Sequence, residues 1–162
     1  MINLIGSHYD TLKDYGIDIK VLKDYSVLLL PENIESKKEG DEFQDAPGSI
    51  LLYKFLRSEG IKCANSKDMG IDSCLFERRG GAIWLGTIWI LENCFFPLII
   101  NIISYKILQN HGNKTEDNQA HLDLRLPNGD HIKYDGNVKT LYSLLHSLEK
   151  DNMEESFHDE WT

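Results

Sequence analysis

Two apolar runs in this chain end in the same pair of polar residues. Residues 28–33 read LLLPEN and residues 88–93 read IWILEN, so a Glu-Asn pair follows each run directly. Two carboxylates in different environments can divide into a general acid and a general base. Amide side chains offer donors and acceptors that orient a sugar or a base. The pattern suits cleavage or transfer at a glycosidic bond, and it also suits simple binding of a polar ligand.

A third apolar segment, residues 61–64, is also followed by polar side chains. In open sheets of parallel strands, ligands bind beyond the carboxyl ends of the strands. If all three segments are parallel strands, their polar ends share one edge of the sheet. We then expect Glu32 and Glu92 as candidate catalytic residues, with four candidate ligand-binding residues at the same edge: Asn33, Asn65, Asp68 and Asn93.

A purely structural role explains the same residues without any ligand. Asn93 can cap the helix expected after it, and Glu92 then favours the positive end of that helix. Glu32 can simply begin a solvated loop. Arg78 and Arg79, which precede two glycines, could form an anion-binding corner or lie in a solvated loop. The chain contains neither the phosphate-binding loop motif nor the dinucleotide-binding glycine motif.

The composition is that of one acidic globular domain. The chain has 162 residues, 41% hydrophobic and 27% charged, with a formal net charge of -9 at pH 7. Binding along a phosphate backbone needs clustered Lys and Arg, so nucleic acid is not expected as a partner. The three cysteines form no C-x-x-C pair, so no metal site, cofactor or disulfide framework is expected. A reducing cytoplasm fits this usage, and residues 1–16 do not resemble a secretion signal.

Residues 82–108 form an apolar run that is long enough to span a bilayer. Four residues interrupt its middle: Glu92, Asn93, Pro97 and Asn101. A carboxylate at the centre of a membrane helix costs about 2.5 kcal/mol or more. We therefore expect a buried strand followed by a buried helix here, and a membrane span is the less favoured alternative.

The hydrophobic pattern predicts a small α/β domain with a mixed sheet in two or three layers. Strand, helix and strand with short connections predict a βαβ unit whose two strands are parallel. The expected elements are a strand over 27–30, a loop over 34–48, a helix over 49–60, a strand over 61–64, a central strand within 81–91 and an apolar helix from 93 to about 109.

Residues 121–135 predict a β-hairpin whose register is decided by its leucines. A two-residue turn at residues 128–129 would pair Leu124 with Lys133 across the strands. A three-residue loop over 127–129 instead pairs Leu124 with Ile132, which keeps one face apolar, so we expect this register. The other pairs then expected are Leu122 with Tyr134, Asp123 with Lys133 and Arg125 with His131.

Residues 137–150 predict a final amphipathic helix, so residues 1–150 are expected to form a single domain, followed by an acidic tail over 151–162. We expect a non-catalytic cytoplasmic module that acts through a protein partner or self-association and senses a small polar or nucleotide-like ligand. An accessory component of a bacterial signalling or defence system is compatible with this description. The alternative is a small hydrolase or glycosyl transferase that acts on a nucleoside- or nucleotide-like substrate through Glu92 and Glu32.

Overall fold

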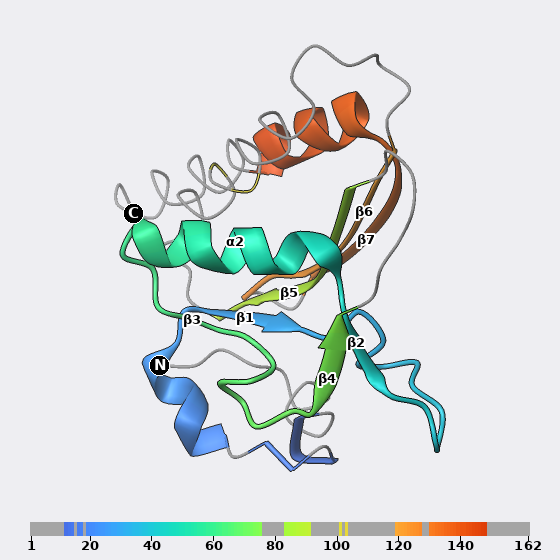
Figure 1. Ribbon diagram of the computed structural model, residues 1–162. Coiled ribbons are helices and arrows are strands. Elements are labelled where there is room, and N and C mark those ends of the chain that lie inside the picture. The colour runs from blue at the N-terminus through green and yellow to red at the C-terminus, as the bar shows by residue number, and fades with distance from the viewer. Residues whose placement is uncertain are drawn as a thin grey trace.

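The computed structural model describes residues 12–14, 16–17, 19–75, 83–91, 101, 103, 119–127 and 130–148. Its centre is a mixed five-stranded sheet with helices, which confirms the predicted small α/β domain (Figure 1). The strands lie in the spatial order β3 (Cys63–Ala64), β1 (Val27–Leu30), β5 (Ile83–Ile90), β6 (Gln119–Arg125) and β7 (His131–Asn137). The longest of them, β5, is the middle strand and is buried along most of its length.

The predicted βαβ unit is present as β1, α2 (Pro47–Ser58) and β3, and its two strands are parallel. Pro47 lies in the first turn of α2, where its missing N–H matters least. Gly60, just beyond the helix, has a φ of +81°, the left-handed conformation that glycine adopts without strain. The helix begins two residues earlier than the expected 49–60, because Ala46 is the cap residue, and the Ser49 hydroxyl donates to the Ala46 carbonyl oxygen.

The direction of β5 differs from the expectation. The strand itself is confirmed, but it runs antiparallel to β1, with Leu30 beside Thr87 and Val27 beside Ile90. The expectation of three parallel strands is therefore wrong. The carboxyl end of β5 lies beside the start of β1, at the edge of the sheet opposite to Glu32. A strand buried on both faces has the same apolar pattern in either direction, so the pattern carries no information about direction.

The hairpin formed by β6 and β7 has the predicted register. All four expected cross-strand pairs are present: Leu122 with Tyr134, Asp123 with Lys133, Leu124 with Ile132 and Arg125 with His131. The backbone N–H of Leu126 donates to the carbonyl oxygen of Asp130 at 2.9 Å, so three residues lie between the paired ends. Along β6 the apolar side chains are buried, and the polar side chains between them are half-buried after the first. The polar face of this hairpin is therefore partly covered.

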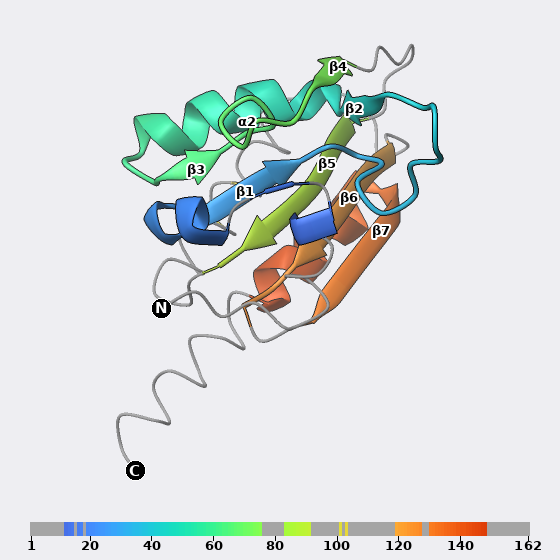
Figure 2. The same cartoon turned by 90° about the horizontal axis from the view of Figure 1, so that it is seen from below.

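Apolar side chains fill both sides of the sheet. On one side, α2 and the helical residues 138–148 cover the larger core, which includes Val27, Leu52, Ile88, Leu124 and Leu141. On the other side, a smaller core includes Leu22, Leu28, Leu30, Ile34 and Trp89. Figure 1 shows the helices above the sheet and the short 3-10 helix η1 (Ile19–Asp24) below it, and Figure 2 shows the sheet from below. The sheet is thus the middle of three layers.

The segment expected to be one long loop contains a strand. β2 (Phe43–Asp45) pairs in parallel with β4 (Ser73–Leu75) in a separate two-stranded sheet. The carboxylate of Asp45 joins them to the end of β3, because it accepts hydrogen bonds of 2.6 Å from the hydroxyls of Ser66 and Ser73. Residues 31–42 form a loop that passes in front of the ends of β5, β6 and β7 (Figure 2). We refer to these residues as the β1–β2 loop.

Two further expectations are tested only in part. Asn101 and Ile103 are helical, as predicted, and the rest of the helix expected over 93–109 lies outside the described residues. Residues 138–148 form the predicted final helix, and the tail over 151–162 lies outside the described residues. The apolar run 82–108 begins with β5, and none of the described helices combines the length and hydropathy that crossing a bilayer requires.

Candidate functional site

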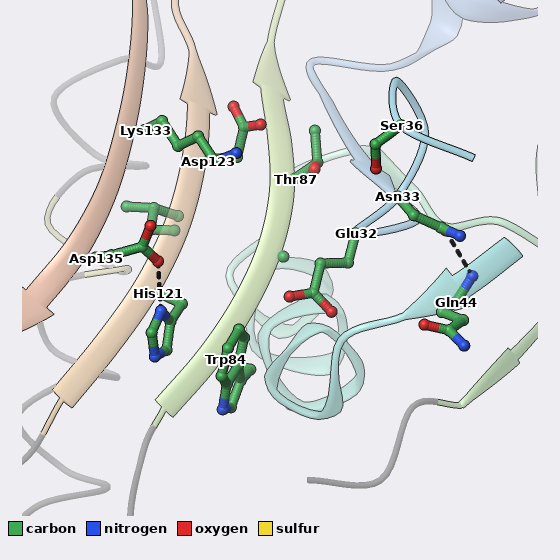
Figure 3. A pocket seen from close by; sticks show the side chains of 12 residues that line it. Glu32, Asn33, Ser36, Gln44, Trp84, Thr87, His121, Asp123, Lys133 and Asp135 are labelled. Carbon is green, nitrogen blue, oxygen red and sulfur yellow. Dashed lines mark hydrogen bonds and ion pairs between the residues drawn. The ribbon is translucent and has the colours of Figure 1, made fainter. Parts of the chain in front are cut away.

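A pocket of about 330 Å³ lies between the β1–β2 loop and the polar face of β5, β6 and β7 (Figure 3). This volume is at the low end of the range for small-molecule sites. The sheet contributes side chains of mixed character to the described lining: Trp84, Thr87, His121, Asp123, Lys133 and Asp135. An aromatic ring, several carboxylates and a threonine side chain thus line one space.

A bulge in β5 places Trp84 and Thr87 on the same face of the sheet. The register with β6 shifts between Trp84 and Gly86, so Leu85 is an extra residue in β5. Without it, side chains three positions apart would point to opposite faces. Gly86 has a φ of +80°, and a Cβ atom there would lie 2.9 Å from the Cβ of Ala46. Only glycine combines this backbone conformation with so close a neighbour.

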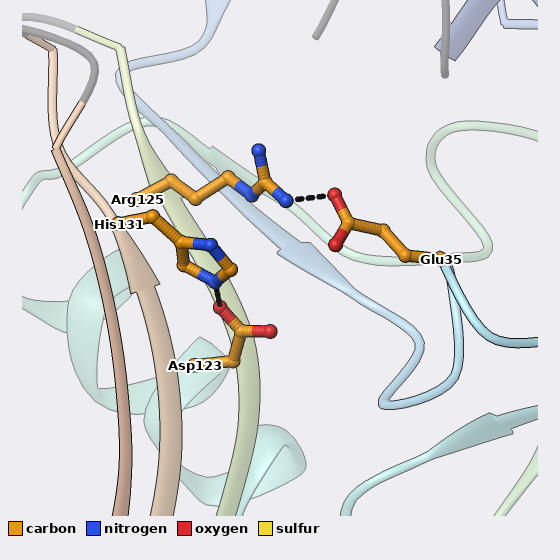
Figure 4. Close-up of polar contacts among 4 residues, drawn as sticks. All are labelled: Glu35, Asp123, Arg125 and His131. Atoms are coloured by element: carbon orange, nitrogen blue, oxygen red, sulfur yellow. Dashed lines mark hydrogen bonds and ion pairs between the residues drawn. The ribbon is translucent and has the colours of Figure 1, made fainter.

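One wall of the pocket is an aromatic pair. The rings of Trp84 and His121 are stacked, with centroids 3.6 Å apart and an interplanar angle of 12°. The Nδ1 atom of His121 also contacts the Oδ1 atom of Asp135 on β7. A second pair of the same kind joins Nε2 of His131 to Oδ1 of Asp123 (Figure 4). Each histidine therefore holds one pocket carboxylate in position.

Thr87 lies between the loop side and the hairpin side of the pocket (Figure 3). The residue is 2% exposed, and its hydroxyl has no hydrogen-bond partner among the described residues. Leaving a buried hydroxyl unpaired costs about 1–3 kcal/mol. Rotation about χ1 exchanges the positions of the hydroxyl and the methyl group. A polar ligand in the pocket can therefore supply the missing partner.

The β1–β2 loop brings two of the sequence-predicted residues, Glu32 and Asn33, to the pocket. The Glu32 backbone N–H donates to the carbonyl oxygen of Gln44 at 2.7 Å. The Asn33 amide donates to the carbonyl oxygen of Glu42 at 3.0 Å and accepts from the Gln44 backbone N–H at 2.9 Å. Asn33 thus shapes the loop by binding the start of β2, and Glu32 is the loop carboxylate that lines the pocket.

The loop is also tied to the far end of β6. Figure 4 shows the guanidinium of Arg125 donating from Nη2 to the Oε1 atom of Glu35. Between the loop and β2, the Lys37 ammonium lies 4.9 Å from the centre of the Phe43 ring. These contacts hold in place the β1–β2 loop, which forms the wall of the pocket opposite the sheet.

Asn65 and Asp68 have contacts of their own beside α2. The Asp68 backbone N–H donates to Oδ1 of Asn65 at 2.9 Å, and the Asn65 N–H donates to Oδ2 of Asp68 at 3.2 Å. Asp68 also accepts from the Tyr53 hydroxyl at 2.8 Å, and that hydroxyl accepts from Arg57. Neither Asn65 nor Asp68 belongs to the described lining that contains Glu32. Their contacts tie β3 to α2.

The other four predicted site residues, Arg78, Arg79, Glu92 and Asn93, lie outside the described residues, so their roles stay predictions. The direction of β5 removes one argument for them. Because β5 ends at the opposite edge of the sheet from Glu32, parallel strand ends no longer supply a reason to pair Glu32 with Glu92.

The described cysteines are not activated nucleophiles. Burial raises the pKa of the Cys63 thiol to about 11. Cys74 is exposed, and its thiol donates to Oε2 of Glu42 at 3.3 Å, which raises the pKa of that thiol. Reactive cysteines have lowered thiol pKa values. Among the described residues, no group of three or more His, Cys, Asp or Glu side chains could hold a metal ion.

Sequence reasoning missed the pocket residues of the sheet. The alternation in β6 predicted a charged face but not that the β1–β2 loop lies over it, because that contact depends on strand order. In a regular strand, the side chains of Trp84 and Thr87 would point to opposite faces of the sheet. The available signal is Gly86, since a glycine inside an apolar strand often marks a bulge.

The pocket combines an aromatic wall, carboxylates held by histidines and a buried hydroxyl without a described partner. Such a site can bind a small polar molecule that has both a ring and hydrogen-bond donors. A search of protein-family models, of curated proteins and of solved structures finds no match for this chain.

Proposed function

We propose that this chain is a non-catalytic α/β module that senses a small polar ligand in the pocket between the β1–β2 loop and β5 to β7. The observation that carries the proposal is the bulge at Leu85. It brings Trp84 and Thr87 to the face that already holds His121 and Asp123, so four chemically different side chains meet in one pocket. A regular strand would need no left-handed glycine here, and β-bulges of this kind are over-represented next to active sites.

Binding without catalysis is favoured over the enzymatic alternative for a geometric reason. Glycosidic cleavage needs two carboxylates that act on opposite sides of one bond. The pair expected for this role, Glu32 and Glu92, depended on parallel strands, and β5 runs antiparallel to β1. The described carboxylates Asp123 and Asp135 each contact a histidine, which suits holding a ligand in place.

The output of such a module is a protein contact in the cytoplasm, as an accessory component of a bacterial signalling or defence system. Support for a contact comes from α2, where the large apolar side chains of Ile50 and Leu51 are 44% and 48% exposed. A partner protein or a second copy of this chain would cover them. Sedimentation of the chain alone and of the Ile50→Ser variant distinguishes self-association from a separate partner.

The ligand pocket is tested by NMR titration of the chain with monosaccharides, nucleosides and nucleotides. We expect backbone signals of β5, β6 and β7 and the Trp84 indole signal to shift, and we expect Trp84→Ala to abolish the shifts. Tyr142→Ala is the matched control, because Tyr142 also stacks on a histidine, His146, but lies on the 138–148 helix. Native mass spectrometry of gently purified protein adds a search for a ligand that is retained from the cell.

Two outcomes would overturn this function. One is the absence of any shift in β5 to β7 together with the absence of a retained small molecule. The other is turnover of a panel compound that is lost in Glu32→Gln while the melting temperature is unchanged, which would establish the enzymatic alternative.

A further inference from the structure

We infer that the pocket recognises the vicinal diol of an unphosphorylated sugar ring, either a free monosaccharide or the ribose of a nucleoside, through the carboxylates of Asp123 and Asp135. The inference rests on the proposed function, because it names the chemistry of the ligand for the same pocket.

The spacing of the two carboxylates suits two adjacent hydroxyl groups. Asp123 lies opposite Lys133 and Asp135 lies opposite His121, so the two aspartates are diagonal neighbours on the same face of the hairpin. Diagonal neighbours on adjacent strands have Cα atoms about 7–8 Å apart, close enough for their side chains to reach the same ligand. Both aspartates line the pocket.

Each aspartate has acceptor capacity left for a ligand. Asp123 uses Oδ1 for His131, and Asp135 uses Oδ1 for His121. A carboxylate offers about four lone-pair sites on two oxygens, so the Oδ2 atom of each can accept a further O–H donor. The histidines hold the carboxylates in place before the ligand arrives, which lowers the entropy lost on binding. A diol supplies two O–H donors from neighbouring carbon atoms and so matches this pair of acceptors.

The charge of the pocket disfavours a phosphate. Three carboxylates, from Glu32, Asp123 and Asp135, and one ammonium, from Lys133, belong to the described lining. A phosphate monoester brings a charge of about -1.5 to -2 at neutral pH. Like charges in a partly enclosed site repel one another more strongly than they do in water. The nucleotide-like ligand of the sequence prediction is therefore less suited to this pocket than the corresponding nucleoside.

The remaining lining suits the ring that carries the diol. Trp84 presents an apolar aromatic surface beside the aspartates, and bases and sugar rings pack on such surfaces. Thr87 adds a hydroxyl that has no partner among the described residues and can pair with a third polar group of the ligand.

The test compares matched ligands on the wild-type chain by isothermal titration calorimetry. The probes are adenosine and uridine, their 2′-deoxy counterparts, their 5′-monophosphates, D-ribose, D-glucose and the diamine putrescine. We expect at least one diol compound to bind, its deoxy counterpart to bind about tenfold more weakly or worse, and its phosphate to bind more weakly than the parent. Tighter binding of nucleosides than of D-ribose identifies a nucleoside as the source of the diol, and comparable binding identifies a free sugar.

Variants test the two aspartates directly. Asp123→Asn and Asp135→Asn keep the side-chain shape but replace an acceptor oxygen by a donor, so each should weaken diol binding about tenfold. Asp72→Asn, at an exposed position outside the pocket, should leave it unchanged. The deoxy series on the wild-type chain decides the question if either pocket variant melts at a lower temperature.

The inference and the proposed function fail in different ways. Equal binding of a nucleoside and its deoxy counterpart, tighter binding of the monophosphate, or binding of putrescine in place of the diols would overturn the diol assignment and leave a ligand pocket in place. The absence of binding by every probe, with no shift in the NMR titration, would overturn both.

Discussion

Glu35 and Arg125 are 90 positions apart in the chain and form an ion pair that joins the β1–β2 loop to the end of β6 (Figure 4). The Arg125 side chain is only 12% exposed, whereas that of Glu35 is 38% exposed. The Cζ atom of Arg125 also lies 5.2 Å from the centre of the Trp89 ring. Burial lowers the pKa of this guanidinium from its ordinary value, but arginine remains charged at any physiological pH. One half-buried cation thus ties the loop wall of the pocket to the sheet.

Glu35→Gln should make the β1–β2 loop open more often, because the variant keeps the side-chain shape but loses the ion pair. A partly exposed pair contributes about 0.5–1 kcal/mol, so the open population should rise about two- to fivefold. The measurement is the rate of tryptic cleavage after Lys37 and Lys38 in the folded chain, which follows the open population when opening is fast. A synthetic peptide of residues 31–42 with and without the change gives the intrinsic cleavage rate. A folded-chain rate that changes no more than the peptide rate would show that the ion pair does not hold the loop.

Gly86→Ala should destabilise the chain strongly, because it adds both backbone strain and a steric contact. A Cβ atom at φ +80° is strained and would lie 2.9 Å from the Cβ of Ala46, so we expect a loss of about 2–4 kcal/mol in the free energy of unfolding. Gly40→Ala is the matched control, because Gly40 has a φ of +90° with no heavy atom within 4 Å of the added Cβ, and should lose about 1–2 kcal/mol. Urea denaturation measures both. Adding Ala46→Gly to Gly86→Ala should recover part of the difference, and equal losses for the two glycines would argue against the close contact.

Asp68→Ala should lower stability without affecting the pocket. The variant loses the acceptor for the Tyr53 hydroxyl and for the Asn65 N–H, which are exposed interactions that together contribute about 1 kcal/mol. Urea denaturation gives the loss, and Asp72→Ala is the control at a nearby exposed carboxylate. Loss of ligand binding in Asp68→Ala at unchanged stability would restore the original prediction that Asp68 is a ligand-binding residue.

Cys63 should make the stability of the chain fall at high pH. Burial raises the thiol pKa from 9.0 to about 11, so between these pH values the unfolded chain releases a proton that the folded chain retains. The contribution of Cys63 to stability is therefore complete below about pH 9 and decreases as the pH rises toward 11. Cys63→Ala should show a flatter decrease over this window. Unfolding free energies measured at pH 7 correct for the packing lost in the variant, and parallel pH curves for the two proteins would contradict the assignment.

Local patterns in the sequence were sufficient for several parts of the fold. Val27 to Leu30 could be predicted as a strand because four consecutive apolar residues end at a proline. The register of β6 and β7 could be predicted because a slip of one residue would expose Leu122 and Leu124. In each of these cases the decisive residues are close together in the chain.

The candidate site could be predicted only at the residues that follow β1. Glu32 and Asn33 line the pocket, because polar residues that directly follow a buried strand lie at its end, and their catalytic and ligand-binding roles stay predictions. Asn65 and Asp68 also follow a strand, but their side chains bond to each other and to Tyr53. The sequence can therefore predict that a residue lies at the end of a strand. Which groups its side chain contacts depends on the elements that pack beside that strand end.

The local pattern of residues is sufficient to predict that β1 is buried and ends before Pro31, that a helix follows it and ends near Gly60, and that β6 pairs with β7 in the observed register. Long-range packing sets the antiparallel direction of β5 beside β1 and the bulge at Leu85 that turns Trp84 toward the same pocket as Thr87. The difference arises because the tendency of a segment to be buried depends on the hydrophobicity of its own side chains. Strand direction and order depend on the packing of segments far apart in the chain, and an apolar pattern is the same for either direction.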